Sequence, residues 1–313
     1  MSLAVIAHPA AGRGQVGRHL PAVLAALRAA DPVVLPASTR ADAIAAARAA
    51  VEAGAVGVVA VGGDGTAHLA LQAVAGTGVP LGLIPLGTGN DLADAVGVPA
   101  DPVAAAHAVL ADLAAARTTV IDAVRVSSAA PLSTAPPHAT APPHADGPWY
   151  AAILSVGFDS AVNARANRMQ WPRGPRRYDL AILAELARLR TYPLTLELDG
   201  TTVEGPALLV AIGNTRSYGG GMRMCPDADP TDGLLDVTVV DPVSRLELIR
   251  VKPRLYSGTH VTHPAVRTYR AATIRVDAPG ASVFADGEPL VPLPLTLTCV
   301  PDAVRLIGAQ LSS

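Results

Sequence analysis

Two glycine-rich segments place backbone amides next to carboxylates, a combination that suits phosphate and metal chemistry. The first is Gly62-Gly63-Asp64-Gly65-Thr66, and the second is Gly87-Thr88-Gly89-Asn90-Asp91. Glycine lets the backbone approach a ligand closely, and the free amides at a helix N-terminus favour an anionic phosphate. A carboxylate beside phosphates is repelled unless it holds a metal or accepts a proton, so Asp64 is a candidate for either role. The alternative is that Asp64, Asn90 and Asp91 only cap helices.

A third glycine-bearing loop, His8 to Gly14, adds a cation to this set. It contains Gly12, Arg13 and Gly14, and Lys252 is the only lysine of the chain. Phosphate charge must therefore be met by arginine, backbone amides and Mg²⁺. The sequence has no GxxxxGK[ST] segment of a P-loop enzyme and no HRD or DFG segment of a protein kinase. No GxGxxG follows the first expected strand, which argues against a dinucleotide-binding dehydrogenase.

An alternation of strands and helices predicts the framework that positions these loops. Strands are expected at 3–7, 33–35, 56–61 and 81–85, with helices at 17–29, from Thr39 onward with Asp42 as its capping partner, and at 67–75. This order predicts an α/β nucleotide-binding domain, a parallel sheet covered by helices, over residues 1–122. Because ligands of such sheets bind beyond the carboxyl ends of the strands, we expect all three loops at one edge.

Residues 123–300 are typical of antiparallel β-structure. Strands are expected at 151–156, 194–198, 207–212, 234–240, 273–276 and 295–300, with only two helices, at 178–190 and 244–256. We therefore predict a β-rich second domain, an antiparallel sandwich that takes the substrate. Residues 127–148, rich in Ala, Pro, Ser and His, resemble a low-complexity insertion, whose histidines are either metal ligands or part of an inert loop. The tail, about 301–313, could return to the first domain.

Charge and composition narrow the class of protein. The 313 residues carry a formal net charge of −2 without a large basic block, so no nucleic-acid partner is expected. The two cysteines are too few for a disulfide framework or a zinc site. There is no basic leader and no apolar run of membrane-spanning length. We expect a cytoplasmic protein whose membrane contact is peripheral, at the inner face of the membrane.

The motifs together resemble a known family. GGDGT, then PLGTGND, then a late Asp286-Gly287-Glu288 are similar, in that order, to the diacylglycerol kinase catalytic family, which includes bacterial lipid kinases and the sphingosine and ceramide kinases. The resemblance implies the fold of the diacylglycerol kinase and NAD kinase group. It also implies an ATP-dependent, Mg²⁺-requiring kinase that transfers the γ-phosphate to a hydroxyl of a lipid, such as diacylglycerol or a sphingoid base.

The same resemblance implies roles for individual residues. The two glycine-rich segments would bind the ATP phosphates, Asp64 would be essential, and Thr39 would contact phosphate. Glu288 becomes a candidate base for the lipid hydroxyl, and Asp64 competes with it for that role. The first loop reads His8-Pro9-Ala10-Ala11-Gly12 where the family usually has Asn-Pro-x-Ser-Gly, so side-chain hydrogen bonds from this loop are in doubt.

Metal ligands are also implied by the resemblance. Asp229 and Asp232, with the carbonyl of Leu234, match a segment that holds a structural Mg²⁺ in some bacterial lipid kinases, and hard oxygen ligands suit that ion. A surface acidic turn is the equally weighted alternative. Asp122 matches an aspartate that reaches the catalytic metal through water.

Contact with a bilayer has one candidate segment. Arg165 to Arg190 holds seven arginines and Trp171 against only Asp179 and Glu185. This patch could rest on an anionic membrane, but a solvated helix with its apolar stripe in the core is the commoner explanation of such a segment. An exposed edge strand in the second domain could support a homodimer.

Two other functions stay open. An NAD kinase or a soluble-metabolite kinase shares GGDGT, but an Asn-Glu-rich segment should follow it, and PLGTGND follows here. A catalytically inactive nucleotide-binding regulator is the other alternative, which the altered first loop favours and the intact carboxylates oppose.

Overall fold

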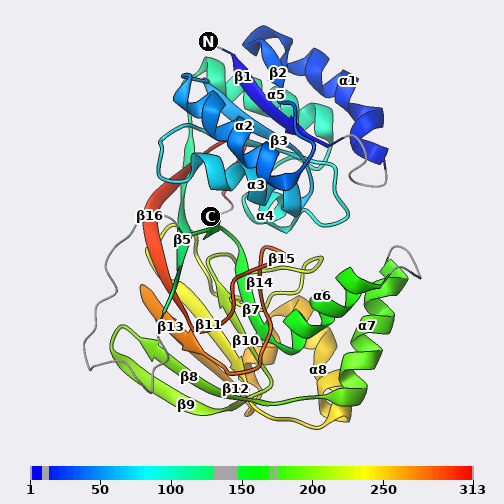
Figure 1. The fold of residues 1–313 in the computed structure, drawn as a ribbon, viewed down its shortest axis with the longest axis vertical. Helices are drawn as coiled ribbons and strands as arrows, with labels where there is room; N and C mark the ends of the chain where they lie inside the picture. Colours follow the sequence, from blue (N-terminus) through cyan, green and yellow to red (C-terminus); the bar gives the residue numbers. More distant parts are fainter. Residues whose placement is uncertain (1, 9–13, 130–146, 170, 172–174, 312–313) are drawn as a thin grey trace. The chain divides into compact units, whose positions relative to one another are not determined.

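The chain forms two compact units in the computed structural model, which describes residues 2–8, 14–129, 147–169, 171 and 175–311 (Figure 1). The first unit consists of Met1–Ala123, Pro230–Asp232 and Val300–Ser313, and the second of Val124–Asp229 and Gly233–Cys299. Most of the low-complexity segment, with His138 and His144, lies outside the described residues.

The first unit is built on a parallel sheet. Its strands β1 (Leu3–Ala7), β2 (Pro32–Val34), β3 (Gly57–Gly62) and β4 (Leu81–Pro85) lie in the order β2-β1-β3-β4. The end of β16 (Leu295–Ile307) pairs in parallel with β4. Every residue of β3 is buried, as expected for a central parallel strand covered on both faces.

Helices flank this sheet: α1 (Gln15–Leu27), continued by a 3₁₀ turn (Arg28–Ala30), α2 (Arg40–Glu52), α3 (Asp64–Val74), α4 (Asp91–Ala95) and α5 (Pro102–Ala114). The predicted capping pair of α2 is confirmed. Thr39 Oγ1 accepts the Asp42 N–H at 3.1 Å, and Asp42 Oδ2 accepts the Thr39 N–H at 3.0 Å. Helix α3 begins three residues earlier than predicted, so Asp64, Gly65 and Thr66 form its first turn.

The second unit is a sandwich of antiparallel strands. One sheet has the order β12-β11-β10-β7-β14-β15, with bounds Val266–Ala271, Leu235–Val240, Leu209–Gly213, Ile153–Gly157, Val283–Ala285 and Glu288–Pro289. The other contains β8 (Tyr192–Leu198), β9 (Thr201–Ala207), β13 (Thr273–Asp277) and the start of β16, with β6 (Trp149–Tyr150) and the later part of β5 (Thr119–Ser128). Buried side chains of both sheets share one core, among them Leu154 and Ile212 from the first and Leu196 and Ile274 from the second.

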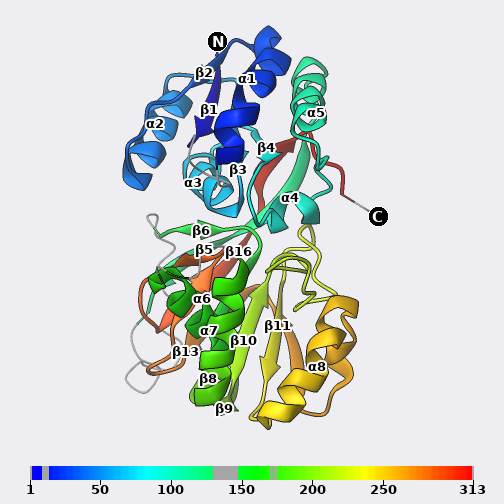
Figure 2. The same ribbon diagram turned by 90° about the vertical axis from the view of Figure 1, so that its right-hand side faces the viewer.

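Three helices of the second unit, α6 (Phe158–Arg168), α7 (Pro175–Arg188) and α8 (Arg245–Ser257), lie on one side of it (Figure 2). Leu189, Leu248 and Leu255 pack with Leu209 and Ala211 of the sheet. Only two helices were predicted in this part, so α6 corrects that expectation. Its sequence, FDSAVNARANR, has no stripe of large apolar side chains, because the face that it buries carries Ser160, Val162 and Ala166.

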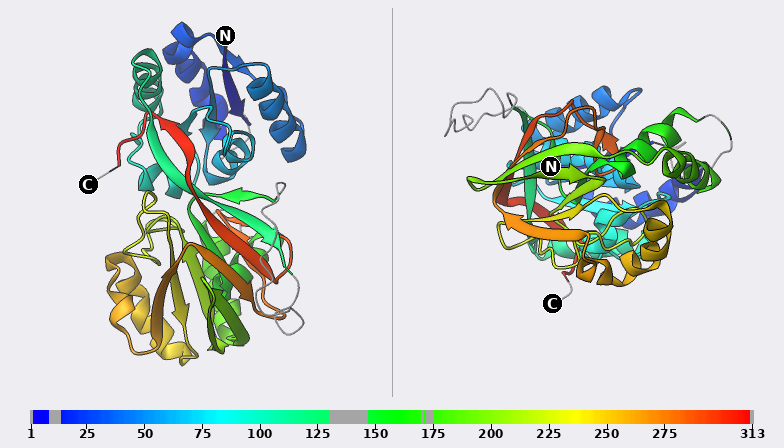
Figure 3. Two further views of the ribbon diagram at one scale, coloured as in Figure 1. Left: turned by 90° about the vertical axis from the view of Figure 1, so that its left-hand side faces the viewer. Right: turned by 90° about the horizontal axis from the view of Figure 1, so that it is seen from below.

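Hydrogen bonds fasten the C-terminal segment within the first unit, and Figure 3 shows the course of the ribbon toward that end in red. The Gly308 N–H donates to Asp112 Oδ2 at 2.7 Å, and Thr119 Oγ1 donates to the Ala309 carbonyl at 2.9 Å. Asp112 is buried in α5 and also accepts from Arg117 Nε at 2.6 Å. One buried carboxylate therefore holds a helix to the last strand.

Asp112→Ala should lower the free energy of unfolding by about 1–3 kcal/mol, because it leaves the buried Gly308 N–H without its acceptor. Arg117→Ala is the control: its side chain is 66% exposed, so we expect a loss of about 1 kcal/mol or less. Urea unfolding of both variants measures the difference. Equal, small losses would show that Asp112 is not the fastening residue.

Candidate active site

The three strands that precede the glycine-bearing loops end at one edge of the parallel sheet. Ala7 of β1 pairs with Val61 of β3, and Gly62 of β3 pairs with Pro85 of β4. The loops that follow β3 and β4 therefore leave the sheet side by side. Of the first loop, residues 9–13, which include Gly12 and Arg13, lie outside the described part of the chain. Gly14, whose φ is +83°, immediately precedes α1.

The second and third loops pack backbone against backbone. The Leu86 N–H donates to the Gly62 carbonyl at 2.8 Å, and the Asp64 N–H donates to the Gly89 carbonyl at 3.2 Å. A Cβ atom on Gly63 would lie 2.6 Å from Gly89 O and 2.8 Å from Gly87 Cα, which is closer than real Cβ atoms come. These glycines are therefore required for contact between the loops. The sequence had suggested only that they let a ligand approach the backbone closely.

Asp64 joins the same two loops through its side chain. It is the first residue of α3, and its Oδ1 accepts the N–H of Leu92, in the first turn of α4, at 3.3 Å. Its Oδ2 lies where a Cβ atom on Gly89 would come within 2.8 Å. The carboxylate thus lies against the PLGTGND loop, so a ligand bound to one loop is close to Asp64.

Asn90 closes the PLGTGND loop on itself. Its Oδ1 accepts the Gly87 N–H at 3.0 Å and its Nδ2 donates to the Gly87 carbonyl at 3.4 Å. It precedes α4 without capping that helix through its side chain. Asp91 follows in the first turn of α4. Asp94 lies three residues after Asp91, a spacing that places the two carboxylates side by side on a helix, and the sequence analysis missed it. Burial and the charge of Asp91 raise the pKa of Asp94.

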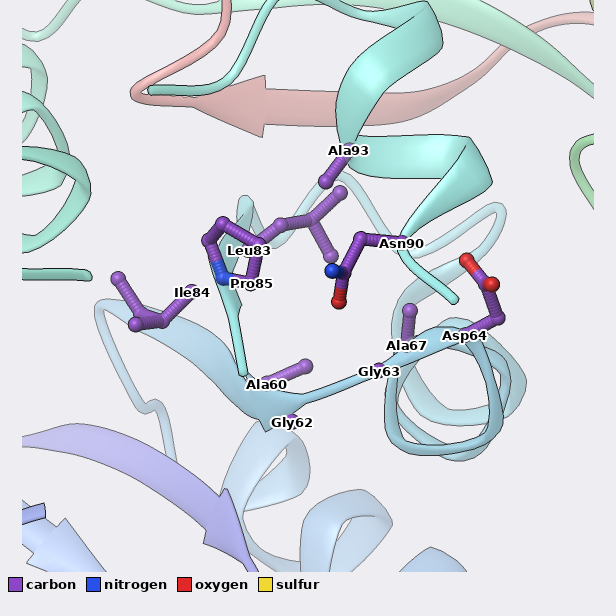
Figure 4. Close-up of a pocket in the computed structure, with 10 residues that line it drawn as sticks. All are labelled: Ala60, Gly62, Gly63, Asp64, Ala67, Leu83, Ile84, Pro85, Asn90 and Ala93. Atoms are coloured by element: carbon purple, nitrogen blue, oxygen red, sulfur yellow. The ribbon is translucent and has the colours of Figure 1, made fainter. Parts of the chain in front are cut away.

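A small pocket lies at this edge of the sheet, between the ends of β3 and β4 and the starts of α3 and α4 (Figure 4). Its lining residues are Ala60, Gly62, Gly63, Asp64, Ala67, Leu83, Ile84, Pro85, Asn90 and Ala93. In Figure 4 the Asn90 amide points into the ring of residues and Asp64 lies at its margin. The wall is mostly apolar, with its polar groups supplied by the two glycine-rich segments.

Two of the three threonines predicted to bind phosphate, Thr66 and Thr39, also have structural neighbours. Thr66 is buried in the first turn of α3, with its side chain against Gly62, where a Cβ atom would overlap it. Thr39 uses its hydroxyl to accept the Asp42 N–H at the start of α2. Phosphate contact by either threonine stays a prediction.

The predicted metal ligands come from two segments that touch: the Asp122 N–H donates to the carbonyl of Pro230, which lies between Asp229 and Asp232 in the sequence, at 2.7 Å. Asp122 is buried in β5, where its Oδ1 accepts the Asp302 N–H at 3.0 Å. Asp229 and Asp232 are exposed in the turn before β11, and Leu234 immediately precedes that strand. Among the described residues, no three His, Cys, Asp or Glu side chains gather as a metal site. The carboxylates at the loops fit Mg²⁺ nonetheless, because this ion usually takes one or two carboxylates and completes its shell with substrate phosphates and water.

Glu288 is positioned by its neighbour Asp286. Asp286 and Gly287 form the turn between β14 and β15 with φ values of +50° and +78°. The Asp286 carboxylate accepts the N–H groups of Ala151 and Ala152, each at 3.0 Å. Sequence reasoning treated Asp286 only as a turn residue and missed this clamp, because its partners lie 135 and 134 residues away.

The hydrogen bonds around Ala151 and Ala152 extend into a glycine-rich stretch of the second unit, residues 213–221, which begins with Gly213-Asn214 and ends with Gly219-Gly220-Gly221. Asn214 is fully buried, its Nδ2 donates to the Ala151 carbonyl at 2.9 Å, and its N–H donates to the Ala152 carbonyl at 2.8 Å. Ala151 and Ala152 are therefore held from one side by Asp286 and from the other by Asn214. Residues from three distant parts of the sequence form one hydrogen-bonded cluster at the base of Glu288.

Farther along that stretch, Tyr218 donates a hydrogen bond through its hydroxyl to Asp159, in the first turn of α6. Burial raises the pKa of Asp159 to about 7. The following glycines, Gly219, Gly220 and Gly221, all have left-handed φ angles of 61–90°.

Neither cysteine of the chain is a candidate nucleophile: both are buried, and burial raises the pKa of Cys225 to about 12.

Comparison with known proteins assigns the family. The description "Diacylglycerol kinase catalytic domain" matches residues 2–126, and "YegS C-terminal NAD kinase beta sandwich-like domain" matches residues 152–308. A diacylglycerol kinase of Mycobacterium tuberculosis is 40% identical over 96% of this chain and 93% of its own. This chain belongs to the diacylglycerol kinase catalytic family. A relative from Stenotrophomonas maltophilia, named a probable YegS-like lipid kinase, is 31% identical over 82% of this chain and 80% of its own.

Solved structures confirm the predicted fold. A diacylglycerol kinase from Bacillus anthracis superposes with a TM-score of 0.69 at 19% identity, over 98% of this chain and 96% of that one. An NAD kinase from Archaeoglobus fulgidus in complex with ATP gives 0.54 at 15% identity, over 98% and 93%. The family's two-part architecture, an α/β unit and a β-sandwich, is thus the one observed here. Within the described residues, no helix is long and apolar enough to cross a membrane.

Asp286→Ala should lower the free energy of unfolding by about 1–3 kcal/mol, because two N–H groups lose their acceptor. Asp199→Ala is a matched control. Asp199 makes an equivalent Asp-Gly turn and accepts the N–H groups of Ala272 and Thr273 at 2.9 and 2.8 Å. We expect a smaller loss of stability in Asp199→Ala, because its hydrogen bonds are exposed to water and those of Asp286 are partly buried. Kinase activity, assayed where both variants are folded, should fall only in Asp286→Ala. Equal activities would show that the clamp does not position Glu288.

Proposed function

We propose that this member of the family is an ATP-dependent lipid kinase that transfers the γ-phosphate of ATP to a hydroxyl of a lipid such as diacylglycerol or a sphingoid base. The observation that carries the proposal is the pair of glycine-rich loops joined by Asp64 at one edge of the parallel sheet. The names of the relatives support a lipid acceptor. The ATP complex of the distant NAD kinase, which shares the fold, supports a nucleotide at such a site.

Phosphate binding would rely on backbone amides, arginine and Mg²⁺. Lys252, the only lysine, lies in α8 of the second unit and so is not part of the loops. Phosphoryl transfer depends mainly on positioning and on electrostatic stabilisation of the transferred group, so a rigid pair of amide-rich loops suits it. Mg²⁺ would supply positive charge between the phosphates, with Asp64 and Asp91 as its candidate protein ligands.

The two candidate bases differ in their surroundings. Asp64 is engaged with the Leu92 N–H and lies against Gly89, which suits a fixed carboxylate that holds a metal beside the phosphates. Glu288 is at the start of β15, on a turn held by Asp286. We assign the base to Glu288. The lipid hydroxyl loses its proton to this carboxylate, and the oxygen of the hydroxyl bonds to the γ-phosphorus. The bond between the γ-phosphorus and the ADP oxygen breaks.

Asp64→Asn should reduce lipid phosphorylation at least about 100-fold while leaving the fold intact, because the amide oxygen can still accept the Leu92 N–H. Glu288→Gln should reduce it by about 10²–10⁴-fold, the usual contribution of a general base. The assay is transfer of label from γ-labelled ATP with Mg²⁺ to a panel of extracted lipids, with NAD and sugars as competing acceptors. Unchanged melting temperatures confirm folding.

Each result has a distinct meaning. Label in a lipid that disappears in Asp64→Asn supports the proposal. Label that appears only in NAD or sugars contradicts the lipid acceptor, and absence of transfer to any acceptor favours a nucleotide-binding regulator. Full activity in Glu288→Gln would return the base to Asp64.

A further inference from the structure

Helix α8 has two apolar faces, and only one of them is covered. Leu248 and Leu255 face inward and pack with the sheet of the second unit. On the outward face Leu246, Ile249 and Tyr256 are 56%, 54% and 50% exposed. Their spacing of three and seven residues places them in one stripe along the helix. Isolated exposed apolar residues are ordinary, but three in line on one helix form a contact surface.

Basic residues border this stripe. At 100° per residue, Arg250 and Lys252 lie on opposite sides of it, and both are exposed. Helix α8 carries Arg245, Arg250, Lys252 and Arg254 against Glu247, an excess of three positive charges in a chain whose net charge is −2. An apolar stripe with cations along its margins is the pattern of a helix that lies in a membrane interface.

Helix α7, which contacts the beginning of α8, also exposes apolar side chains. Arg245 Nη2 donates to the Ala187 carbonyl at 2.7 Å, so the beginning of α8 lies against the end of α7. Leu183, one turn before Ala187, is 60% exposed, and Leu180 is 41% exposed. Figure 2 shows both helices on the same side of the sandwich. The basic segment that ends at Arg190 therefore belongs to the same side of the unit as α8.

We propose that the outward face of α8, continued by Leu183 and Leu180 of α7, docks the second unit on an anionic lipid bilayer. The proposal rests on the proposed lipid-kinase function, because an acceptor lipid with two acyl chains resides in a bilayer. Leu246 and Ile249 enter the acyl boundary, Tyr256 lies at the polar interface, and Arg250 and Lys252 contact anionic headgroups. A second copy fits this face poorly, because two equally basic helices would repel each other.

Vesicle sedimentation without ATP or diacylglycerol tests the docking directly. The chain should bind phosphatidylcholine vesicles that contain phosphatidylglycerol, and bind much less without that anionic lipid. Leu246→Ser with Ile249→Ser should weaken binding at least about tenfold, because the variant no longer transfers two apolar side chains from water into the bilayer. Arg250→Gln with Lys252→Gln should weaken it by about fivefold for each cation removed, and high salt should reproduce this loss.

The matched control is Val33→Ser with Val34→Ser. These valines are 46% and 39% exposed on β2 of the first unit, so the change removes exposed apolar surface elsewhere and should leave vesicle binding unchanged. Melting temperatures show whether the α8 variants fold. If the serine pair fails to fold, the glutamine pair, which changes only exposed cations, carries the test.

Three results would overturn the docking surface: no binding of the native chain to the anionic vesicles, unweakened binding of both α8 pairs, or binding weakened as much by the control. If the α8 variants lose a dimer that the native chain forms in sedimentation velocity, while their vesicle binding is intact, the face is assigned to a second copy.

Kinase assays separate this proposal from the proposed function. Dioctanoylglycerol in detergent should be phosphorylated equally by the native chain and the serine pair, whereas long-chain diacylglycerol in vesicles should distinguish them. Vesicle binding that depends on α8, without phosphorylation of either diacylglycerol or of any lipid in the extracted panel, would refute the lipid kinase and leave the docking standing.

Discussion

Close contact between Gly63 and Gly87 is the constraint on which the candidate nucleotide site depends. Neither position can carry a Cβ atom without overlap with the other loop. Because the backbones touch, the Asp64 N–H reaches the Gly89 carbonyl and the Asp64 carboxylate reaches the Leu92 N–H. The parallel register of β3 and β4 brings the loops to the same level, and the glycines let them close the remaining distance. Rigidity of this kind is what phosphoryl transfer requires of a protein, since the chemistry depends on positioning.

The second unit uses a different device for the same purpose. Glu288 follows a tight turn whose left-handed residues, Asp286 and Gly287, fix the hairpin. The Asp286 carboxylate and the buried Asn214 hold the backbone of Ala151 and Ala152 between them. The role that we propose for Glu288, accepting a proton, needs a fixed position, and this cluster holds the turn that precedes Glu288. On the outer side of the same unit, α8 leaves an apolar stripe uncovered, and this is the face that we propose docks on a bilayer.

Many of the helices, strands and caps could be predicted from the sequence, because they depend on residues that are close together in the chain. The buried run of β3, the Thr39–Asp42 cap and the strand–loop–helix order each depend on neighbouring residues, and each was found. The start of α3 was placed too late because Gly65 lowers helix propensity, while the packed loops stabilise the first turn. Helix α6 was missed because it buries small and polar side chains. The partners of Asp64 and Asp286 lie 28 and more than 130 residues away, and no local pattern shows such pairs.

Calorimetric titration of Mg·ATP into Gly87→Ala and Gly54→Ala tests the central claim most directly. Gly54 has a left-handed φ of +83° with open space around it, so its alanine variant loses about 1 kcal/mol of stability through backbone strain alone, far from the loops. The loop contact predicts that Gly87→Ala binds Mg·ATP at least about tenfold more weakly than the native chain, whereas Gly54→Ala binds it normally. Native affinity in a folded Gly87→Ala variant would contradict the account, since the nucleotide would not depend on the contact between the loops.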